Sequence, residues 1–432
     1  MDNGDDNPRG RRICILTFFY SPAGGGIPRY VDNLSKKFVE MGHKVDIITA
    51  SYDEEQIEKK DNLTVYLLPC MNIFSKTEQE NKASARDLID FLRKYVKKEK
   101  PSIFSAQSFH TAFNAIGHSL ALNMVALERK IPLTLTVHSF VQNDESEQIK
   151  MTSLKDLLWD KIISIGPTLG EFLLEKGVSR EKISISYPGV DINQFRPGLG
   201  KKWLRSRIGI SESDILILYA GRVDSIKIAE SKGIMTLLKA MSSIKNKKVK
   251  LLISAAQVTP PFKEAKDEAI EKIKERAKLL NKADKIIIET FSPENMPLVY
   301  NGADICVLPS KDENCSLFIS ESMACGLPVI ATTVGGIPDI VENGKTANLV
   351  PPDDSVELAK QIGILLRSPS KAKKMGEEAR KTLEEMQELG KVCRNLLGIY
   401  ESVIKKKENK TQEHHKPLKS SAIPTSKPTI LL

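Results

Sequence analysis

The chain of 432 residues is long enough to form two globular domains, and its apolar (41%) and charged (28%) fractions are ordinary for a folded protein. It contains no uninterrupted apolar run long enough to cross a bilayer. The first residues, MDNGDDNPRGRR, lack the apolar segment of a secretory signal, so we expect a cytoplasmic location. The six cysteines form no CxxC pair and no zinc-binding spacing, which argues against structural disulfides and against a zinc site.

The formal net charge of +9 is consistent with an anionic partner such as a phosphate, a membrane surface or nucleic acid. Much of this charge lies in the lysine-rich, polar residues 406–432, which have too little apolar surface to fold. We therefore expect a disordered basic tail there and a disordered N-terminus at residues 1–11. For the tail a solubilising role is favoured over a binding role, and nucleic acid is not expected as a partner.

The first half of the chain alternates between strand and helix patterns. Residues 11–22, RRICILTFFYSP, predict a buried strand that ends at Ser-Pro. Residues 23–42 predict a glycine loop and then a helix, because apolar residues recur at helical spacing until Gly42. Further strands are expected at residues 43–50, 62–69, 102–107 and 132–140, and helices at 85–100 and 111–130. Strands that alternate with helices predict right-handed crossovers and a parallel sheet.

The alternation is interrupted once and then restarts. Residues 187–200, YPGVDINQFRPGLG, are dense in proline and glycine, and we place an interdomain hinge at residues 194–207. Beyond it, strands are expected at residues 214–221, 248–256, 285–290, 303–310, 328–333 and 347–352, with helices between them. The chain thus predicts an α/β protein of two doubly wound, Rossmann-like domains, residues 12–193 and 208–387, that face a central cleft.

The glycine loop is the first candidate for ligand binding. Gly24, Gly25 and Gly26 lie between a strand and a helix, where free backbone N–H groups can bind a phosphate or a polar sugar. The segment AGGGIP is neither the GxGxxG dinucleotide fingerprint nor a Walker loop. By itself it is as consistent with a plain tight turn as with a ligand loop.

A pair of basic residues follows the first strand of the second half. Arg222 and Lys232 lie between that strand and the next helix, at the carboxyl edge of the predicted sheet, where open α/β folds bind ligands. The planar fork of Arg and the point charge of Lys suit a diphosphate leaving group. Either residue alone would be read as a solvated surface base.

Two glutamates eight positions apart, Glu313 and Glu321, flank the N-terminus of a short predicted helix in KDENCSLFISESMACGLPV. The helix fits between about Ser316 and Cys325, with Asn314 or Ser316 as its cap. With Glu313 on the preceding loop, both carboxylates can lie near the free N–H groups of the helix N-terminus, around Ser316 and Leu317. Such a site would bind phosphates on the amides and sugar hydroxyls on the carboxylates.

One histidine lies at a comparable position in the first half of the chain. His138 ends the strand TLTVH at the carboxyl edge that faces the predicted cleft. A lone histidine is more often structural than functional, and no other pattern near it decides between the two.

In their order along the chain, these features resemble the family 4 retaining glycosyltransferases, the glycogen-synthase-like group with the GT-B fold. The resemblance extends from about residue 12 to residue 400. The matching segments are GGGIPRYVDNLS, TVH, YPGVDINQFRP, AGR with the later KG, NGADICVLPS, the two glutamates with ESMACGLPVIAT, and VGGIPDIVENGK with LVPPDD.

The resemblance implies transfer of a sugar from a nucleotide-sugar donor to an acceptor hydroxyl, with retention of the anomeric configuration. It also implies that no metal and no cofactor other than the donor is needed. By position, Arg222 and Lys232 would stabilise the donor diphosphate, Glu313 would contact the sugar hydroxyls and Glu321 would hold the ribose.

The rest of the donor site follows from the same resemblance. Gly25, Gly26 and His138 would complete the sugar pocket from the first domain, and Ser316 and Leu317 would lie beside the donor. A final helix at residues 388–405 would cross back to the first domain. No carboxylate nucleophile is evident, so the resemblance implies a front-face route in which a phosphate oxygen of the leaving group accepts the acceptor's proton.

The chain departs from the family pattern at three places near the donor. ENCSL stands where many relatives have Glu-x-Phe-Gly-Leu, and neither LLISAAQVTP nor IIIETFSP carries its usual glycines. A UDP-sugar is favoured on family frequency, but the nucleobase, the donor sugar, the linkage, the oligomeric state and the role of the tail remain open.

The acceptor also remains open, and a glycan or a lipid-linked acceptor is expected. Basic stretches such as RKYVKKEK suggest peripheral contact with a membrane, although a solvated helix face explains them equally well. A non-catalytic GT-B-like binding or assembly subunit is the alternative function. The presence of Arg222, Lys232, Glu313 and Glu321 together argues against it.

Overall fold

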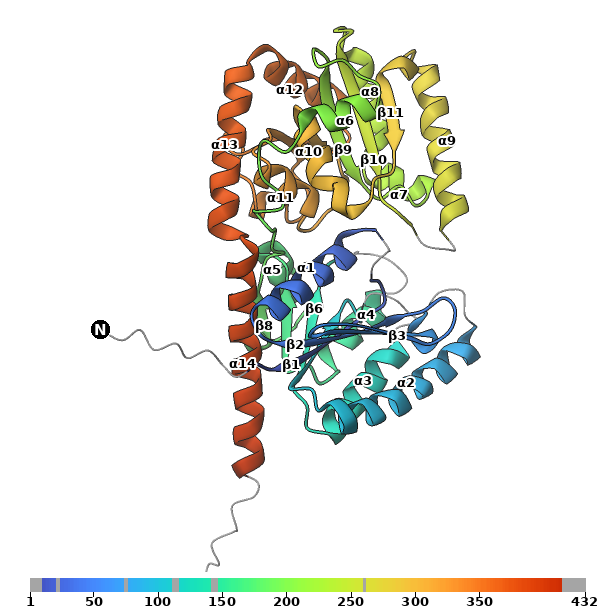
Figure 1. Ribbon diagram of the computed structural model, residues 1–432, viewed down its shortest axis with the longest axis vertical. Helices are drawn as coiled ribbons and strands as arrows, with labels where there is room; N and C mark the ends of the chain where they lie inside the picture. Colours follow the sequence, from blue (N-terminus) through green and yellow to red (C-terminus); the bar gives the residue numbers. More distant parts are fainter. Residues whose placement is uncertain are drawn as a thin grey trace, which may run out of the picture.

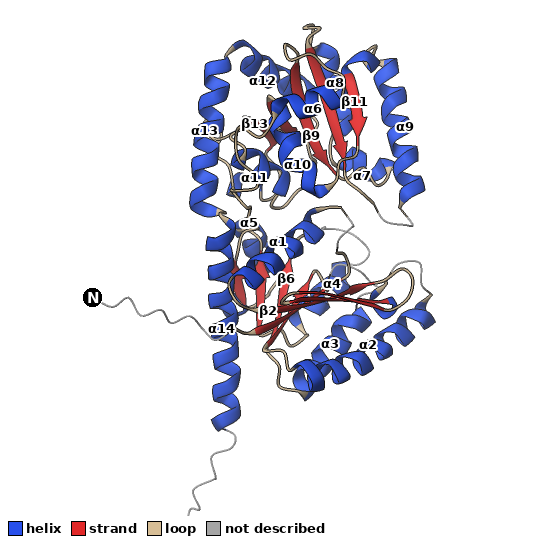
Figure 2. Ribbon diagram, in the orientation of Figure 1, coloured by secondary structure: helices blue, strands red, loops and turns tan. Residues whose placement is uncertain are grey.

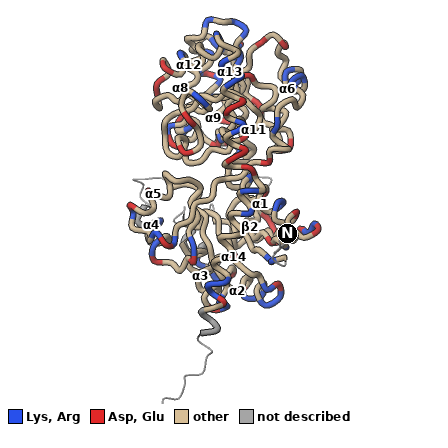
Figure 3. Tube along the Cα trace, turned by 90° about the vertical axis from the view of Figure 1, so that its left-hand side faces the viewer, with Lys and Arg blue, Asp and Glu red and all other residues tan. Residues whose placement is uncertain are grey.

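The computed structural model describes residues 10–20, 24–73, 77–110, 116–140, 147–258 and 262–413. They form two α/β domains, one above the other, with two long helices along one side (Figure 1). Each domain is built on its own sheet, and helices cover the sheets (Figure 2). The prediction of two doubly wound domains is therefore confirmed. Acidic and basic residues are interspersed over both domains (Figure 3).

The sheet of the first domain has eight strands in the order β3-β4-β2-β1-β5-β6-β7-β8. The strands are β1 (Arg12–Thr17), β2 (Lys44–Ala50), β3 (Gln56–Lys60), β4 (Leu63–Leu68), β5 (Ile103–Gln107), β6 (Leu133–Val137), β7 (Lys161–Ser164) and β8 (Ile183–Ile185). In the centre, Ile13 of β1 pairs with Val45 of β2 and Ile103 of β5, and both pairings are parallel. These central strands are buried on both faces, which is why they read as continuous apolar runs in the sequence.

The edge strand β3 corrects the expectation of a wholly parallel sheet. It pairs antiparallel with β4, and all five of its residues are exposed. Because the segment QIEKK faces solvent on both sides, it has no apolar period from which a strand could be predicted. The polar edge leaves the central, parallel part of the sheet unchanged.

Helices pack on both faces of this sheet. They are α1 (Gly26–Glu40), α2 (Glu78–Glu99), α3 (Ile116–Glu128), α4 (Glu147–Lys155) and α5 (Pro167–Glu175), with 3-10 turns at Pro69–Met71 and Arg180–Lys182. Helix α2 begins before residue 85, where the sequence predicted it, because Thr77 and Glu80 form a capping box ahead of its apolar residues. Two apolar clusters result, one between the sheet and α2 and α3, and one under α1.

The sheet of the second domain has six parallel strands in the order β11-β10-β9-β12-β13-β14. The strands are β9 (Ile215–Gly221), β10 (Val249–Ala255), β11 (Ile286–Glu289), β12 (Ile305–Leu308), β13 (Val329–Thr332) and β14 (Asn348–Val350). The helices are α7 (Ile226–Ser231), α8 (Ile234–Ser243), α9 (Lys263–Leu279), α10 (Met296–Gly302), α11 (Leu317–Ala324) and α12 (Ser355–Arg367), with 3-10 turns at Ala283–Lys285, Pro293–Asn295 and Ile337–Asp339.

The region predicted as a hinge, residues 194–207, contains a helix in its second half. Helix α6 (Lys201–Arg207) packs against α10 of the second domain. Its Arg205 is buried and donates to Asp304 at 2.6 Å, which fixes α6 to the second domain. A hinge over the whole of residues 194–207 is therefore wrong, because α6 is already part of the second domain.

The chain returns to the first domain through two consecutive helices, α13 (Pro369–Met386) and α14 (Leu389–Glu413). Where the two helices meet, the chain is hydrogen-bonded to Val190, which lies between the two domains in the sequence. The N–H of Val190 donates to the Gln387 carbonyl at 2.9 Å, and the N–H of Leu389 donates to the Val190 carbonyl at 3.0 Å. Helix α14 then lies along the first domain (Figure 1), where the Tyr400 hydroxyl hydrogen-bonds Ser105 Oγ at 2.7 Å.

Part of each segment that was predicted to be disordered is folded. Helix α14 continues to Glu413, so residues 406–413 are helical and do not belong to a disordered tail. At the other end, Arg11 forms an ion pair with Glu401 of α14 at 2.9 Å, so it lies within the folded domain. Residues 1–9 and 414–432 lie outside the described residues. No helix in the described ranges is both long enough and apolar enough to cross a bilayer.

Candidate active site

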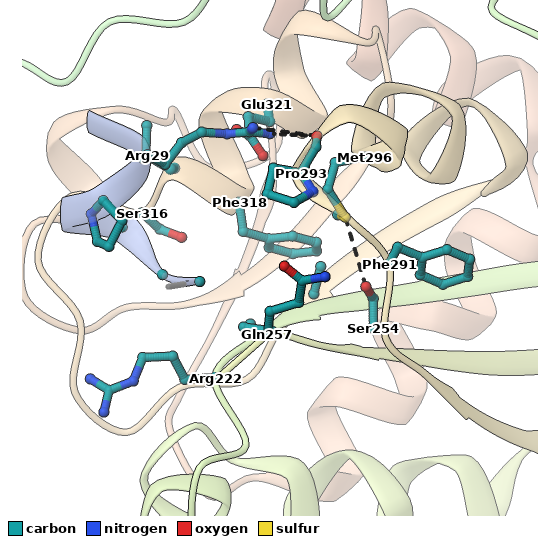
Figure 4. Close-up of a pocket in the computed structure, with 18 of the residues that line it drawn as sticks. Arg29, Arg222, Ser254, Gln257, Phe291, Pro293, Met296, Ser316, Phe318 and Glu321 are labelled. Atoms are coloured by element: carbon teal, nitrogen blue, oxygen red, sulfur yellow. Dashed lines mark hydrogen bonds and ion pairs between the residues drawn. The ribbon is translucent and has the colours of Figure 1, made fainter. Parts of the chain in front are cut away.

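A cavity of about 300 Å³ lies between the two domains. Its walls come from the glycine loop and α1 of the first domain, and from the carboxyl ends of β9, β10 and β12 with the loops and helices that follow them. Of the residues predicted for the site, the cavity brings eight together: Gly25, Gly26, Arg222, Lys232, Glu313, Ser316, Leu317 and Glu321. Figure 4 shows how part of this wall is arranged.

The glycine loop touches the second domain directly. The N–H of Gly24 donates to the carbonyl of Gln257 at 3.0 Å, and a Cβ at Gly24 would lie 2.5 Å from that oxygen. Gly25 has a φ of 122°, a conformation that side-chain-bearing residues rarely adopt, and it caps the N-terminus of α1. Glycines are therefore needed here for a close approach of backbone to backbone across the cavity.

The helix predicted between about Ser316 and Cys325 is α11 (Leu317–Ala324), and Ser316 is its N-cap residue. Glu313 lies on the preceding loop and Glu321 lies within the helix, which is the arrangement that would bring both carboxylates to one ligand. The loop is held by Gly335, whose positive φ of 51° and close approach leave no room for a Cβ, since that atom would lie 1.7 Å from the Glu313 carbonyl oxygen.

Lys232 and Glu313 face each other in the cavity wall. Lys232 Nζ lies 2.8 Å from Glu313 Oε2, and both side chains are mostly buried. Lys232 directly follows the short helix α7, which occupies part of the segment between Arg222 and Lys232. The carboxylate pairs with the ammonium group and holds it at the cavity.

Arg222 directly follows β9 and is half exposed, at 51% of its side chain. Its Nε and Nη2 donate to Asp224 Oδ2 at 2.6 and 2.5 Å. Asp224 is buried, and its Oδ1 has no hydrogen-bond partner among the residues that the structure describes. Asp224 therefore orients the guanidinium group, which lies on the opposite side of the cavity from Glu321 (Figure 4).

Glu321 is almost fully buried, and both of its oxygens accept hydrogen bonds. Tyr300 of α10 donates to Oε2 at 2.8 Å, and Arg29 of α1 donates from Nε to Oε1 at 3.1 Å. Burial lowers the pKa of Arg29, but the Glu321 carboxylate more than offsets this, so the pKa lies above its ordinary value. Burial, and then Glu321, raise the pKa of Tyr300 well above its ordinary value.

His138 is the predicted site residue that does not line this cavity. Its ring is buried, and Nε2 donates to Gln107 Oε1 at 2.9 Å. The ring also packs edge-on against Tyr30, with centroids 4.7 Å apart. Burial, and to a lesser extent His110, lower the pKa of His138 to about 3, so the imidazole is neutral at physiological pH. His138 was predicted to complete the sugar pocket, but in this arrangement of the two domains its side chain lies outside the cavity.

Several cavity residues had no signal in the sequence. One end of the cavity is lined by Ser254 of β10, Phe291 after β11 and Met296 of α10, and Ser254 Oγ donates to Met296 Sδ at 3.8 Å. These residues come from or follow the two strands whose loops lack the family's usual glycines. Arg29 could have been suspected from one feature, a basic residue in the first turn of the helix after the glycine loop.

No group of three or more His, Cys, Asp or Glu side chains within the described ranges is placed to hold a metal ion. The cations that line the cavity are the side chains of Arg29, Lys36, Arg222 and Lys232. Each lies against a carboxylate of the same cavity or beside it.

Comparison with known proteins identifies the family. The model of the Glycosyltransferase Family 4 matches residues 24–194, and that of the Glycosyl transferases group 1 matches residues 201–382. The D-inositol 3-phosphate glycosyltransferase of Thermobifida fusca is 26% identical over 408 residues, which cover 84% of this chain and 87% of the relative. The MMP alpha-(1->4)-mannosyltransferase of Mycolicibacterium hassiacum is 24% identical and covers 91% of this chain and 98% of its own.

Solved structures show the same fold. Sucrose-phosphate synthase from Thermosynechococcus elongatus superposes with a TM-score of 0.77 at 22% identity, covering 92% of this chain and 100% of that one. The Anabaena protein HepE in complex with UDP and glucose gives a TM-score of 0.71 at 15% identity, covering 91% and 100%. The two family matches account for both domains, so this chain is a GT-B glycosyltransferase that belongs to the family 4 glycosyltransferases.

Proposed function

We propose that this glycosyltransferase moves a hexosyl unit from a nucleotide-diphosphate sugar, with a UDP-sugar favoured, to an acceptor hydroxyl with retention of configuration and without a metal. The observation that carries the proposal is the joint placement of Arg222, Lys232, Glu313 and Glu321 in one interdomain cavity. Two cations and two carboxylates around a helix N-terminus match the diphosphate and the hydroxyls of such a donor.

In this proposal the leaving group is stabilised by the second domain. The bond between the anomeric carbon and the diphosphate breaks, and the diphosphate departs with the electron pair. Arg222 and Lys232 stabilise its developing charge, and their carboxylate neighbours, Asp224 and Glu313, hold them in place. The acceptor oxygen bonds to the same face of the sugar, and its proton passes to a phosphate oxygen of the leaving group. No protein nucleophile is needed.

The carboxylates and the glycine loop bind the rest of the donor. Glu313 receives the sugar hydroxyls, Glu321 receives the ribose diol, and the backbone of Gly25 and Gly26 borders the sugar from the first domain. The apolar end of the cavity, with Phe291 and Met296, accommodates the base. A UDP-sugar is supported by HepE, solved with UDP and glucose, and a hexosyl group by the mannosyltransferase among the relatives.

The decisive experiment is a transfer assay with a panel of UDP-, GDP- and ADP-sugars, preceded by thermal-shift screening of the same donors. We expect stabilisation by one nucleotide class and hydrolysis or transfer that resists EDTA. NMR of the product should show the anomeric configuration of the donor. Inversion, or activity lost with EDTA and restored by Mg²⁺, would contradict the proposed mechanism. An Arg222→Ala variant as active as the parent would remove Arg222 from the catalytic role.

The acceptor is proposed to be a glycan or a lipid-linked sugar presented at an anionic membrane surface. In its last turns, helix α2 exposes three lysines: Lys94, Lys97 and Lys98. Helix α3, which packs against α2, exposes three apolar side chains: Leu120, Met124 and Leu127. Basic and apolar residues on adjacent helices match the headgroups and the acyl boundary of such a membrane.

Vesicle co-sedimentation tests the membrane contact. Binding should be stronger with vesicles that contain phosphatidylserine than with phosphatidylcholine alone, and it should weaken as salt rises. A Lys94→Glu/Lys97→Glu variant should lose most of it, while Lys274→Glu on α9 of the second domain serves as a matched control. Binding that ignores both lipid charge and salt would count against this surface.

A further inference from the structure

Glu321 is shared between the two domains. One of its oxygens accepts from Tyr300, which belongs to the same domain, and the other accepts from Arg29, which belongs to α1 of the first domain. The Arg29 and Glu321 side chains are only 14% and 7% exposed, so this ion pair is largely protected from water. A pair with so little exposure depends on its geometry, and loss of either partner leaves the other charge poorly compensated.

Arg29 is oriented almost entirely by residues outside its own domain. Its Nη1 and Nη2 donate to the carbonyl of Pro293, at 3.3 and 3.4 Å, and its guanidinium lies 5.2 Å from the centre of the Phe195 ring. Figure 4 shows the side chain reaching toward Glu321 and Pro293. The whole arrangement therefore requires that α1 lie close to the second domain.

The ion pair leaves Glu321 able to bind a ligand. A carboxylate offers about four lone-pair positions, and Arg29 and Tyr300 occupy one on each oxygen. The remaining positions can accept a pair of hydroxyl groups, and Glu321 lines the cavity. Arg29 thus orients the carboxylate without occupying all of its acceptor sites.

We propose that Arg29 is a positioning residue that the first domain supplies to the ribose-binding carboxylate of the second, so that this subsite is complete only when the domains are closed. The inference rests on the proposed function, in which Glu321 binds the ribose diol. Domain closure and recognition of the diol are then coupled, because each stabilises the arrangement that the other requires.

Loss of Arg29 is therefore expected to have a signature that a general loss of stability lacks. The fraction of closed molecules falls, and the affinity for the nucleotide falls with it. Recognition of the ribose hydroxyls falls further, because Glu321 loses the partner that fixes its orientation. Rates at saturating donor change less than the KM for the donor, because the closed state can still be reached.

The test compares nucleotides that differ only in the ribose hydroxyls. Calorimetry with UDP, GDP and ADP identifies the base that the parent binds, and the 2′,3′-dideoxy form of that nucleotide is then titrated. We expect the parent to prefer the ribo form by about tenfold or more, since hydroxyls bound to a carboxylate are lost. Arg29→Met should reduce this preference to about twofold or less, and Arg29→Lys should give an intermediate value.

A second interdomain contact provides the matched control. Asp339 of the second domain accepts from the backbone N–H and the hydroxyl of Thr168 on α5, at 2.9 and 2.7 Å, and neither residue lines the cavity. Asp339→Ala should weaken binding of the ribo and dideoxy nucleotides by the same factor. In small-angle scattering, the nucleotide-free Arg29→Met protein should be more extended than the parent, and saturating nucleotide should restore the parent's radius of gyration.

The outcomes separate this inference from the function on which it rests. If the parent binds none of the three nucleotides, the proposed donor class is wrong, and the inference falls with it. If the parent binds one and Arg29→Met keeps the parent's full preference for the ribo form, Arg29 does not position Glu321. Should Arg29→Met be too unstable to titrate, Arg29→Lys decides, because parent-like discrimination together with a parent-like KM would equally overturn the role.

Discussion

The two domains contribute to the cavity in different ways. The second domain supplies four charged side chains of the cavity wall, on the segments after β9 and β12 and on α11: Arg222, Lys232, Glu313 and Glu321. Among the described residues of the first domain, the contribution consists of glycine backbone and of side chains of α1, chiefly Arg29. Under the proposed function, the charges that would stabilise a diphosphate therefore lie in the second domain, and the first domain would close the cavity over it.

The domains also differ in how self-sufficient they are. The second domain encloses a single apolar cluster built from its own helices and the segment that leads into it. One apolar cluster of the first domain is completed by Leu389, Cys393, Leu396, Tyr400 and Ile404 of α14, which follow the second domain in the chain. This cluster of the first domain is therefore complete only when α14 is in place.

The largest effect is expected where the second domain carries charge. Lys232→Met removes the ammonium group that faces Glu313 and should lower the transfer rate at saturating donor about a hundredfold, or roughly 3 kcal/mol of transition-state stabilisation. Lys311→Met is the matched control, since Lys311 pairs with Asp353 at 2.8 Å and does not line the cavity. Equal rates for both variants would show that charge in the second domain is not decisive.

The next effect concerns the dependence of the first domain on α14. Leu396 is fully buried against the first domain, and Leu396→Ala should destabilise that domain by about 2–5 kcal/mol. Hydrogen exchange should show faster exchange of amides in β1 and β5, with β9 and β10 unchanged. Lys405→Ala, at an exposed position of the same helix, should change neither domain. Equal acceleration in both domains would mean that they unfold as one unit.

A pH effect that comes from histidine should be confined to the first domain, because residues 208–387 contain no histidine. Burial lowers the pKa of His110 to about 4 and that of His138 to about 3. The unfolded chain binds these protons near pH 6.5 and the folded chain does not. Stability is therefore fully present above about pH 6.5 and decreases as pH falls toward 4, by about 1.4 kcal/mol per pH unit for each histidine.

Hydrogen exchange between pH 7.5 and pH 5 checks this, with amides of β5 and β6 reporting on the first domain. His110→Gln should flatten the pH dependence of protection there. The protection factors of amides in β9 and β10 should stay the same at every pH. If the second domain lost more protection than the first as the pH falls, the prediction that the first domain is the pH-sensitive one would be wrong.

The smallest effect is expected beside the donor sugar, at Cys315. Cys315 is partly buried, and this burial raises the pKa of its thiol well above the ordinary value and leaves it uncharged. Cys315→Ser keeps the shape and changes the polarity, so we expect the ratio of kcat/KM between two donor sugars to shift by less than about tenfold. Steady-state assays with the two best donors measure it. No change in the ratio, against a clear change in Cys306→Ser, would place selectivity elsewhere.

Much of the second domain could be predicted from the sequence, because its strands are buried on both faces and end at recognisable turns. The positions of Glu313 and Glu321 around α11 followed from helix-capping residues and a terminating glycine, all local in the chain. The fold could be predicted because its signals are also local: each of the seven segments, which occur in the family's order, matches a pattern of a few adjacent residues.

What could not be predicted depends on contacts between distant residues. Arg29 reaches Glu321 across 292 positions, and no local pattern indicates such a partner. His138 was correctly placed at the carboxyl edge of its strand, but Gln107 and Tyr30 turn its ring into the first domain. Strand β3 and helix α6 lack a strong apolar period, since one is exposed on both faces and the other is seven residues long.

The chain crosses between the domains twice, and the two crossings are hydrogen-bonded to each other at Val190, Gln387 and Leu389. The connection is therefore double. Opening must bend both segments at the same point, which restricts the motion to rotation about one region and excludes independent drift of the domains. It also means that a protease that cuts only one of the two segments would leave the domains joined, and both cuts would be required to separate them.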